Sequence, residues 1–356
     1  MINVLEEIDA KPLSKARDVL AFFSGEREIF DAAKLLRRHF ANRFEILPLY
    51  ARLSAADQRR VFTQSAARRR IVLATNVAET SLTVPNIGYV IDTGLARVAR
   101  YSYRSKLQRL PIEPISQASA NQRAGRCGRV APGVCYRLFD EGDFQARPEF
   151  TDAEIRRVNL ASVVLQMQAL GLGDIYRFPF IDPPEQKAIK DAVRLLEELC
   201  AIEAGKLTSL GRRMARMPVD PRLAAMLLAS DDQGCLAQML IIVSALAVQD
   251  VRERPIEKAQ AAATAHERFV DEQSEFLTYL NLWRWMEQQR SELTNSRWQT
   301  ALRKRFINPM RVREWREIYR QLKTVCTELG LKSNSTPGNF QQIHESILVG
   351  SLSQIG

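Results

Sequence analysis

Short apolar segments alternate with segments of helical periodicity over residues 17–140, and this alternation constrains the fold most. The run 19–23, for example, ends at Ser24 and Gly25, and apolar residues at helical spacing follow it. Hydrophobic strands separated by helices are typical of a parallel sheet with helices on both faces. The sequence therefore predicts an α/β domain with strands over 19–23, 45–49, 71–74 and 87–91, and a helix over 55–64 capped by Ser54.

The segment after Gly94 has a different pattern, with alternating residues over 95–101 and 107–115 and a polar turn between them. This pattern predicts a β-hairpin inserted into the α/β domain. Between Thr93 and Arg137, Glu113 is the single acid among nine basic residues: Arg97, Arg100, Arg104, Lys106, Arg109, Arg123, Arg126, Arg129 and Arg137. The excess favours contact with a polyanion, and a solvated basic face is the alternative.

The rest of the chain is predicted to be mostly helical. The unit that ends near Gly211 has the size of a winged helix, and 222–248 and 267–329 have the pattern of a helical bundle. Core packing is the expected role of Trp283, Trp285, Trp298 and Trp315, with base stacking as the alternative. We expect domains over 1–147, 148–218 and 219–332, with 333–356 as the start of a further region.

Composition narrows the possible partners and setting. The net charge of +10 and the pI near 9.5 favour polyanions such as nucleic acid, an anionic membrane or an acidic protein. The five cysteines form no C-x-x-C pair and the three histidines lie far from them in sequence, so we expect no metal site and a reduced, cytoplasmic setting. No signal-peptide pattern is visible, and the most apolar stretch, 236–248, is too short to span a bilayer, so no membrane partner is expected.

The run 121–129, Asn-Gln-Arg-Ala-Gly-Arg-Cys-Gly-Arg, combines three arginines with two glycines. If it is helical, Gln122, Arg126 and Arg129 fall on one face at i, i+4 and i+7, and Arg123 points elsewhere. Guanidinium groups suit phosphate oxygens, and glycines allow a ligand or another backbone to approach closely. The run is therefore a candidate phosphate-binding element.

Three stretches taken together resemble a known family. Residues 19–29, 74–86 followed by 89–94, and 122–129 are similar in order and spacing to motifs IV, V and VI of superfamily 2 helicases. The Ala-Thr-Asn-x-Ala-Glu-Thr-Ser-Leu-Thr form of the second stretch is specific to the DEAH/RHA (DEAH-box) branch, and 100–119 resembles the bacterial HrpA-type members. The resemblance covers nearly the whole chain. It implies a RecA-like parallel-sheet domain followed by winged-helix and ratchet-like helical domains.

The resemblance implies a nucleotide site. Motif VI of the family supplies arginine fingers, here Arg126 and Arg129, and Gln122 would place the attacking water or touch the γ-phosphate. Thr83 matches a position near the nucleotide, and Phe62 matches an aromatic residue that stacks on adenine. A core position for Phe62, and pairing with surface acids for the two arginines, are the alternatives.

The resemblance also implies contacts with the backbone of single-stranded RNA, with structured or ribosomal RNA left open. Small donors suit phosphates and 2′-hydroxyls rather than bases, and the implied residues are Ser24, Gly25, Thr75, Asn76 and Thr80. Capping or turn roles are the alternative for the polar side chains. The hairpin matches a family element that separates or guides strands, with phosphates tracked by Arg100, Arg104 and Arg109.

The sequence contains no G-x-x-x-x-G-K-[S/T] loop and no D-E-x-H, which in this family hold ATP and Mg²⁺ in a first RecA-like domain. We therefore expect the second RecA-like domain and the helical domains of a longer ATP-dependent RNA helicase that moves 3′ to 5′. Its partners would be RNA and that first domain, and its own ATPase activity would be small. A non-catalytic nucleic-acid-binding or regulatory module and a DNA-directed helicase segment are the alternatives.

Overall fold

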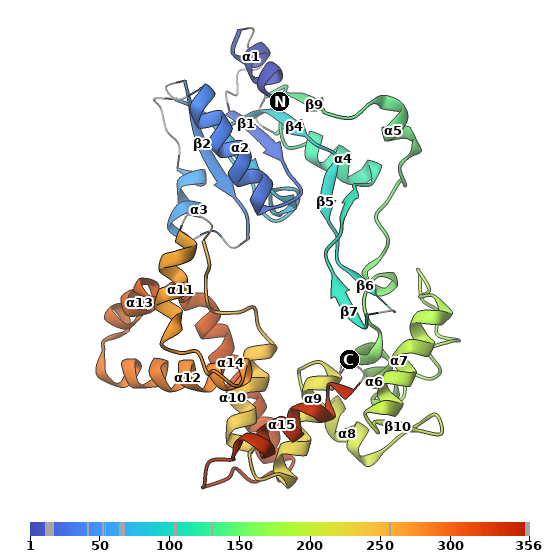
Figure 1. Cartoon of the computed structure of the whole chain (residues 1–356). Coiled ribbons are helices and arrows are strands. Elements are labelled where there is room, and N and C mark those ends of the chain that lie inside the picture. Colours follow the sequence, from blue (N-terminus) through green and yellow to red (C-terminus); the bar gives the residue numbers. More distant parts are fainter. Residues whose placement is uncertain are drawn as a thin grey trace. The chain divides into compact units, whose positions relative to one another are not determined.

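The computed structural model describes residues 1–10, 18–40, 43–51, 53, 55–63, 68–102, 105–129, 131–255 and 258–352 (Figure 1). The chain forms two compact units. Unit 1 comprises Met1–Ser102 and Leu107–Val158, and unit 2 comprises Tyr103–Lys106 and Asn159–Gly356.

Unit 1 is built on a five-stranded sheet in the order β2-β3-β1-β4-β9. Every neighbouring pair is parallel, and in the central strand Leu20 lies opposite Val72 on one side and Val90 on the other. The predicted parallel sheet is therefore confirmed. Its strands are β1 (Asp18–Phe22), β2 (Phe44–Leu49), β3 (Arg69–Ala74), β4 (Ile87–Asp92) and β9 (Val134–Arg137).

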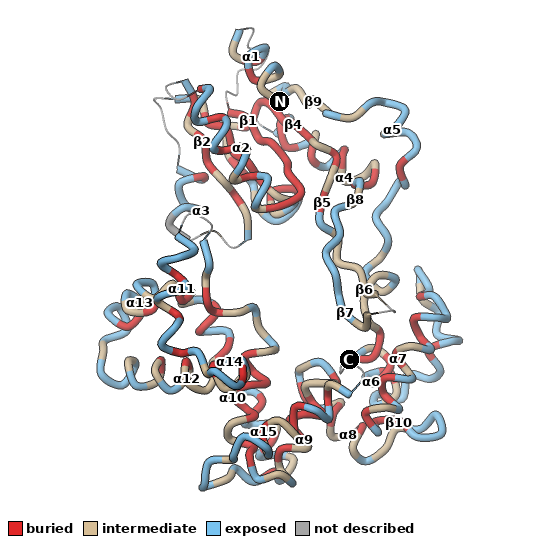
Figure 2. The backbone as a smooth tube through the Cα atoms, in the orientation of Figure 1, coloured by how far each residue is buried: buried red, intermediate tan, exposed pale blue. Residues whose placement is uncertain are grey.

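Helices cover both faces of this sheet, and the strands between them are buried (Figure 2). Because side chains alternate across a strand, Leu20 belongs to the apolar cluster of one face and Ala21 to that of the other. Helices α1 and α2 pack on the face of Ala21, and α3 and the 3₁₀ turn η1 pack on the face of Leu20. Their bounds are Ile2–Ala10 for α1, Glu26–His39 for α2, Ala55–Phe62 for α3 and Asn76–Ala78 for η1.

The predicted hairpin begins at Gly94, directly after β4, and its antiparallel pairing confirms it. Gly94 has a φ of +74°, and a Cβ there would lie 2.5 Å from the Phe139 ring, so the turn requires glycine. The hairpin pairs β5 (Leu95–Arg97) with β8 (Ile112–Pro114), and β6 (Arg100–Ser102) with β7 (Leu107–Arg109). The remaining elements of unit 1 are α4 (Gln117–Ala124), α5 (Glu141–Ala146) and the 3₁₀ turn η2 (Glu154–Arg156).

The described part of unit 2 is mainly helical, with one short antiparallel hairpin and an isolated antiparallel bridge between Arg252 and Ile307. The predicted helical segments are divided by turns: Gly234, at a φ of +67°, lies between the first two helices of 222–248. The first elements are α6 (Ala161–Ala169), α7 (Gln186–Glu198), β10 (Ile202–Glu203), β11 (Lys206–Leu207) and α8 (Ser209–Ala215). The later helices are α9 (Pro221–Asp232), α10 (Leu236–Leu246), α11 (Ala259–Glu267), α12 (Glu275–Glu292), α13 (Asn295–Lys304), α14 (Pro309–Glu328) and α15 (Phe340–Val349).

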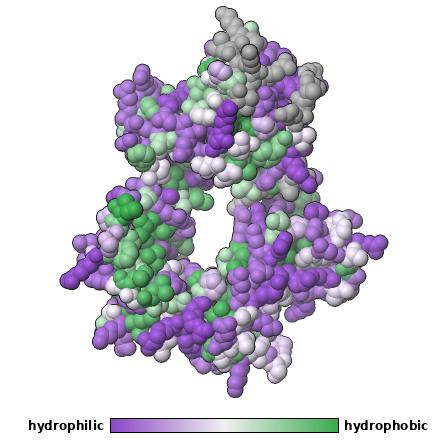
Figure 3. Space-filling model, turned by 180° about the vertical axis from the view of Figure 1, so that it is seen from behind, coloured by the Kyte–Doolittle hydropathy of each residue, from purple (hydrophilic) through white to green (hydrophobic). Residues whose placement is uncertain are grey.

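All four tryptophans belong to one apolar cluster of unit 2, which confirms their role in core packing. Trp298 and Trp315 are buried, and Trp283 and Trp285 pack against them while partly buried. The indole Nε1 of Trp315 donates to Ser244 Oγ at 2.9 Å, so its polar atom is satisfied inside the core. The surface drawn in Figure 3 is largely hydrophilic, with apolar patches between the polar residues. No helix in the described ranges is long and apolar enough to cross a membrane.

A buried ion pair lies at the amino edge of the unit 1 sheet. Arg70, in β3, donates from Nε and Nη2 to Asp18 Oδ2 of β1, at 2.8 and 2.5 Å. Further guanidinium bonds reach the carbonyl oxygens of Val61, Thr63 and Pro85. Both charged side chains are almost completely buried, so the pair joins two strands to the end of α3.

We expect Asp18→Asn to lower the free energy of unfolding of unit 1 by about 3–5 kcal/mol, because it leaves the Arg70 guanidinium buried without a counter-charge. The matched control is Glu45→Gln, which removes the carboxylate from an exposed pair with Arg60 and should cost less than about 1 kcal/mol. Urea unfolding followed by circular dichroism measures both variants. Equally small effects would contradict the importance of the buried pair.

Candidate functional site

The carboxyl ends of the parallel strands meet at one edge of the unit 1 sheet. Ser24 and Gly25 lie just beyond β1, Thr75 follows β3 and Thr93 follows β4. Thr93 Oγ1 donates to Phe22 O at 3.0 Å, which ties the ends of β4 and β1 together. From β1 the chain continues to β2, on one side of β1, and from β3 it crosses to β4, on the other side. The two connections therefore diverge, and this edge has a topological switch point, which is the usual ligand position of an open α/β sheet.

The start of α2 combines several features that suit a phosphate. Gly25 is the N-cap residue of α2 and makes no side-chain cap, so the start of the helix is open to an anion. The Ser24 N–H, in contrast, donates to Glu28 Oε2 at 3.2 Å, and a phosphate would have to displace this carboxylate. Ser24 is 4% exposed, and its buried hydroxyl has no hydrogen-bond partner within the described residues. Arg97 lies over Gly25, with its Nε 2.9 Å from where a Cβ would stand. The sequence did not predict this contact of Arg97 with Gly25, and it identified Arg97 merely as one of the basic residues of the hairpin region.

The loop after β3 presents most of its expected contact residues to solvent. Thr75 precedes η1 but its side chain makes no cap hydrogen bond, so the capping alternative does not hold for that turn. Asn76, Thr80 and Thr83 are exposed. Thr83 Oγ1 accepts a hydrogen bond from Arg129 Nη1 at 2.6 Å, which brings the ends of the second and third sequence motifs together.

The shared helical face predicted for the arginine run is wrong, because α4 ends at Ala124. The next residue is Gly125, and a glycine inside a helix costs roughly 1 kcal/mol relative to alanine, which explains an early end. Gln122 is exposed on the helix, whereas Arg126 lies beyond it and is only 8% exposed. Arg129 lies further along the same turn and is exposed.

Arg126 is held by backbone oxygen atoms of the loop after β3. Its guanidinium donates to the carbonyl oxygens of Glu79 and Leu82. Burial lowers the pKa of this guanidinium from its ordinary value, and the neighbouring charge of Arg129 acts in the same direction. Within the described residues this buried cation bonds to two neutral carbonyl oxygens, which it can exchange for an anion.

Three charged residues that the sequence did not single out lie beneath this surface. Arg123 is fully buried, and its guanidinium contacts the carboxylates of Glu79 and Asp92. Asp92 directly follows the apolar run 87–91, and Glu79 and Asp92 both lie inside the second motif stretch, which was the signal that could have drawn attention to them. Glu79 and Asp92 precede Arg123 by 44 and 31 residues along the chain.

The hairpin arginines are not equivalent. Arg100 forms ion pairs with Glu113 at 2.8 Å and Asp152 at 3.1 Å, and these hydrogen bonds raise the pKa of its guanidinium. A phosphate contact by Arg100 would have to compete with these two carboxylates, and it stays a prediction. Asp152 is too far along the chain for the sequence to reveal the pair. Arg109 is exposed. Arg104 lies outside the described residues.

Phe62 is a surface residue, and the core alternative for it is wrong. It is 37% exposed at the last position of α3, while the preceding Val61 is fully buried and packs on the sheet. The predicted helix over 55–64 ends at this residue, and both Ser54 and Gln64 lie outside the described ranges. An exposed aromatic ring at a helix end is free to take part in a binding surface.

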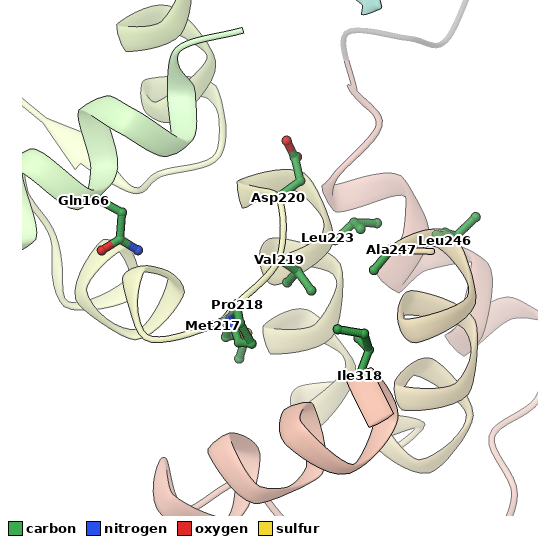
Figure 4. Close-up of a pocket in the computed structure, with 9 residues that line it drawn as sticks. All are labelled: Gln166, Met217, Pro218, Val219, Asp220, Leu223, Leu246, Ala247 and Ile318. Atoms are coloured by element: carbon green, nitrogen blue, oxygen red, sulfur yellow. The ribbon is translucent and has the colours of Figure 1, made fainter. Parts of the chain in front are cut away.

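A separate cavity of about 550 Å³ lies in unit 2, where α6, α9, α10 and α14 approach one another (Figure 4). Its wall is mainly apolar, and its polar lining residues are already engaged in the fold. Gln166 donates to Ala215 O, and Asp220 caps α9. Across the described ranges, no group of three or more His, Cys, Asp or Glu residues is arranged to hold a metal ion.

Three family models match the chain. The family described as helicase conserved C-terminal domain matches residues 2–131, which hold four of the five strands of the parallel sheet and the clustered motifs. The winged-helix and the ratchet-like parts of the helicase-associated domain match residues 192–219 and 220–279. Fold and edge residues together therefore define the chain as a helicase C-terminal region with its associated helical domains.

Similar proteins narrow this class. The chain is 55% identical to the ATP-dependent RNA helicase HrpA of Escherichia coli over 99% of its own length and 28% of that protein. It is 54% identical to the HrpA homologue of Haemophilus influenzae, over 100% of the chain and 28% of that protein. The chain thus spans about 28% of the length of these curated relatives. The crystal structure of the DExH-box NTPase HrpB of E. coli matches with a TM-score of 0.73 and 25% identity, over 98% of this chain and 36% of that one. The chain belongs to the DEAH-box helicase family, in its HrpA-type branch.

We expect Phe62→Ala to change the free energy of unfolding of unit 1 by less than about 1 kcal/mol, because the ring is exposed at a helix end. The adjacent Val61→Ala should lower it by about 2 kcal/mol, since it removes two buried methyl groups from the core. Chemical denaturation compares the two variants directly. If Phe62→Ala were as destabilising as Val61→Ala, Phe62 would be a core residue and unsuited to stacking on a nucleotide.

Proposed function

We propose that this chain is the C-terminal part of an ATP-dependent DEAH-type RNA helicase, in which it couples ATP hydrolysis to 3′-to-5′ movement on single-stranded RNA and to unwinding. The observation that carries the proposal is the convergence of three sequence motifs at one sheet edge. The loops after β1 and β3 and the turn after α4 come from three separate parts of the chain, and the parallel sheet brings them together. Named relatives that are RNA helicases support the choice of RNA.

On the nucleotide side, Arg126 and Arg129 act as arginine fingers. In reaching a γ-phosphate, the Arg126 guanidinium exchanges the Glu79 and Leu82 carbonyl oxygens for charged phosphate oxygens, and bonds to ionised acceptors are roughly twice as strong as neutral ones. Gln122, exposed on α4, positions the attacking water. Thr83 beside Arg129, and the exposed ring of Phe62, contact the nucleotide.

ATP and Mg²⁺ are bound mainly by the first RecA-like domain, the proposed partner of this chain. The donors on this chain fit phosphate oxygens, because they are guanidinium and hydroxyl groups, and the part of the chain that the structure describes has no carboxylate cluster that would attract a metal. When bound, the nucleotide supplies the γ-phosphoryl group, and the residues of this chain stabilise the negative charge that develops on it.

On the RNA side, the edge residues contact backbone rather than bases. Ser24 and Gly25 with Arg97 form one phosphate contact, and a second lies along the loop after β3, at Thr75, Asn76 and Thr80. The hairpin extends this surface through Arg109. Arg100 and Arg104 belong to the proposed surface from their place in the hairpin sequence. Arg100 also braces the hairpin through its ion pairs with Glu113 and Asp152.

The proposal includes a domain division and a cellular setting. We place a second RecA-like domain over 1–147, a winged-helix domain over 148–218, a ratchet-like bundle over 219–332 and a further region from 333. A cytoplasmic location is proposed because all five cysteines are free thiols.

We expect Arg109→Glu to weaken binding of a fluorescently labelled single-stranded RNA about tenfold and to reduce the slope of log affinity against log salt by about one, because one phosphate contact is lost. The matched control is Lys34→Glu, an equal charge change on the exposed side of α2, which should alter affinity about twofold or less. Fluorescence anisotropy at several salt concentrations gives both quantities. Identical responses of the two variants would remove the hairpin from the RNA surface, and tighter binding of a DNA strand of the same sequence would favour a DNA-directed protein.

We expect the purified chain to show no RNA-stimulated ATP turnover, because its sequence lacks the P-loop that holds the phosphates. Joining it to the first RecA-like domain of a HrpA relative should restore turnover. In that protein Arg126→Ala or Arg129→Ala should lower kcat by about 10³-fold or more, while Arg37→Ala, on the exposed side of α2, should not. Turnover by the chain alone, or insensitivity to both finger substitutions, would contradict the proposed roles.

A further inference from the structure

Arg123 is buried completely at the carboxyl edge of the sheet, and its guanidinium makes four hydrogen bonds there. Its Nε donates to Glu79 Oε2 at 2.9 Å, and its Nη1 donates to Asp92 Oδ1 at 2.8 Å. Nη1 and Nη2 also donate to the Leu95 carbonyl oxygen, at 3.2 and 3.3 Å. The Arg123 guanidinium carbon lies 4.7 Å from the centre of the Phe22 ring. One side chain therefore touches the ends of β1 and β4, the start of the hairpin and the loop after β3.

Glu79 connects this buried group to the arginine turn above it. Its carboxylate accepts from Arg123 and, at 2.7 Å, from the Ser119 hydroxyl of α4. Its backbone carbonyl accepts from Arg126. A shift of Glu79 would therefore move the contacts of Arg123 and Arg126 together. The nucleotide side of the proposed site is joined through one residue to the buried base of the hairpin.

The group is built so that only a guanidinium fits it. One cation serves two carboxylates and one carbonyl in different directions, which matches the planar fork of arginine and not the compact ammonium of lysine. Asp92 Oδ1 also accepts from the Gly94 N–H at 2.9 Å, at the turn that starts the hairpin. Asp92 Oδ2 is buried and has no partner within the described ranges, so this carboxylate is held by Arg123 and the turn alone.

The same sheet contains a comparable arginine that does not face the site. Arg70 is as deeply buried as Arg123 and bonds to the carboxylate of Asp18 and to three carbonyl oxygens, but at the amino edge. Its partners belong to β1, the end of α3 and the loop before β4, and none of them is an expected contact residue. Arg70 therefore has the same structural task without a connection to the hairpin.

We infer that Arg123 is a positioning residue that fixes the base of the hairpin and the loop after β3 in one arrangement, so that the RNA contacts and the arginine fingers are held in register. The part of this inference that concerns RNA rests on the proposed function. The contact between Arg123 and the base of the hairpin is given by the hydrogen bonds and does not depend on that function.

The test compares Arg123→Lys with Arg70→Lys in the full chain, at a temperature where both are folded by circular dichroism. Both should be destabilised. Arg123→Lys should weaken binding of labelled single-stranded RNA about tenfold, the effect expected if the displaced hairpin and loop lose one charge-assisted hydrogen bond to the RNA. Arg70→Lys should stay within about twofold of the unmodified chain. Hydrogen exchange should accelerate at the Val98 and Ile115 amides, which bond across the hairpin, only in Arg123→Lys.

If Arg123→Lys does not fold, Glu79→Gln replaces it, since this change removes one charge and retains the Glu79 carbonyl that holds Arg126. Equal loss of RNA affinity in both lysine variants, or unchanged exchange of the hairpin amides in Arg123→Lys, overturns the inference. An unmodified chain that fails to bind RNA refutes the proposed function instead, and hairpin exchange then decides the positioning role by itself.

Discussion

Parallel strands all end at the same edge, and the arrangement of the proposed site depends on that constraint. Ser24, Thr75 and Thr93 are separated by long stretches of chain, yet each follows a strand of one sheet. Two helical layers bury both faces of the strands, so the edge is the place where polar groups can meet a ligand. These motif residues, far apart in the sequence, therefore lie close together in space, because each follows a strand of the same sheet.

Buried ion pairs fix the strand ends and loops at both edges of the sheet. Taking an ion pair out of water costs several kcal/mol for each ion, so such pairs persist where hydrogen bonds satisfy them in full. Arg70 at the amino edge and Arg123 at the carboxyl edge each make several hydrogen bonds of this kind, although Asp92 Oδ2 beside Arg123 has no partner within the described residues. The difference lies in what they hold: Arg70 joins elements of the core, whereas Arg123 joins the hairpin, β4 and the loop that carries Glu79.

The fold was largely predictable, since its elements follow from local patterns. Hydrophobic runs identified the strands, the change to alternation after Gly94 identified the hairpin, and the tryptophans packed as a core cluster. The site was less predictable. The arginine run was expected as a helix, but α4 stops at Ala124, where two glycines weaken helical propensity and Arg126 finds carbonyl oxygens outside the helix.

The sequence by itself determined the strands, the hairpin, the basic character of the region between Thr93 and Arg137, and the motifs that relate the chain to DEAH-box helicases. Only the tertiary structure decided which arginines are exposed, which are buried and which acids neutralise them. Arg100 meets Asp152 at 52 residues' distance along the chain, and Arg123 meets Glu79 at 44. The physical reason is that periodicity reports the nearest neighbours along one element, whereas the state of a charge depends on the groups that folding brings within hydrogen-bond reach.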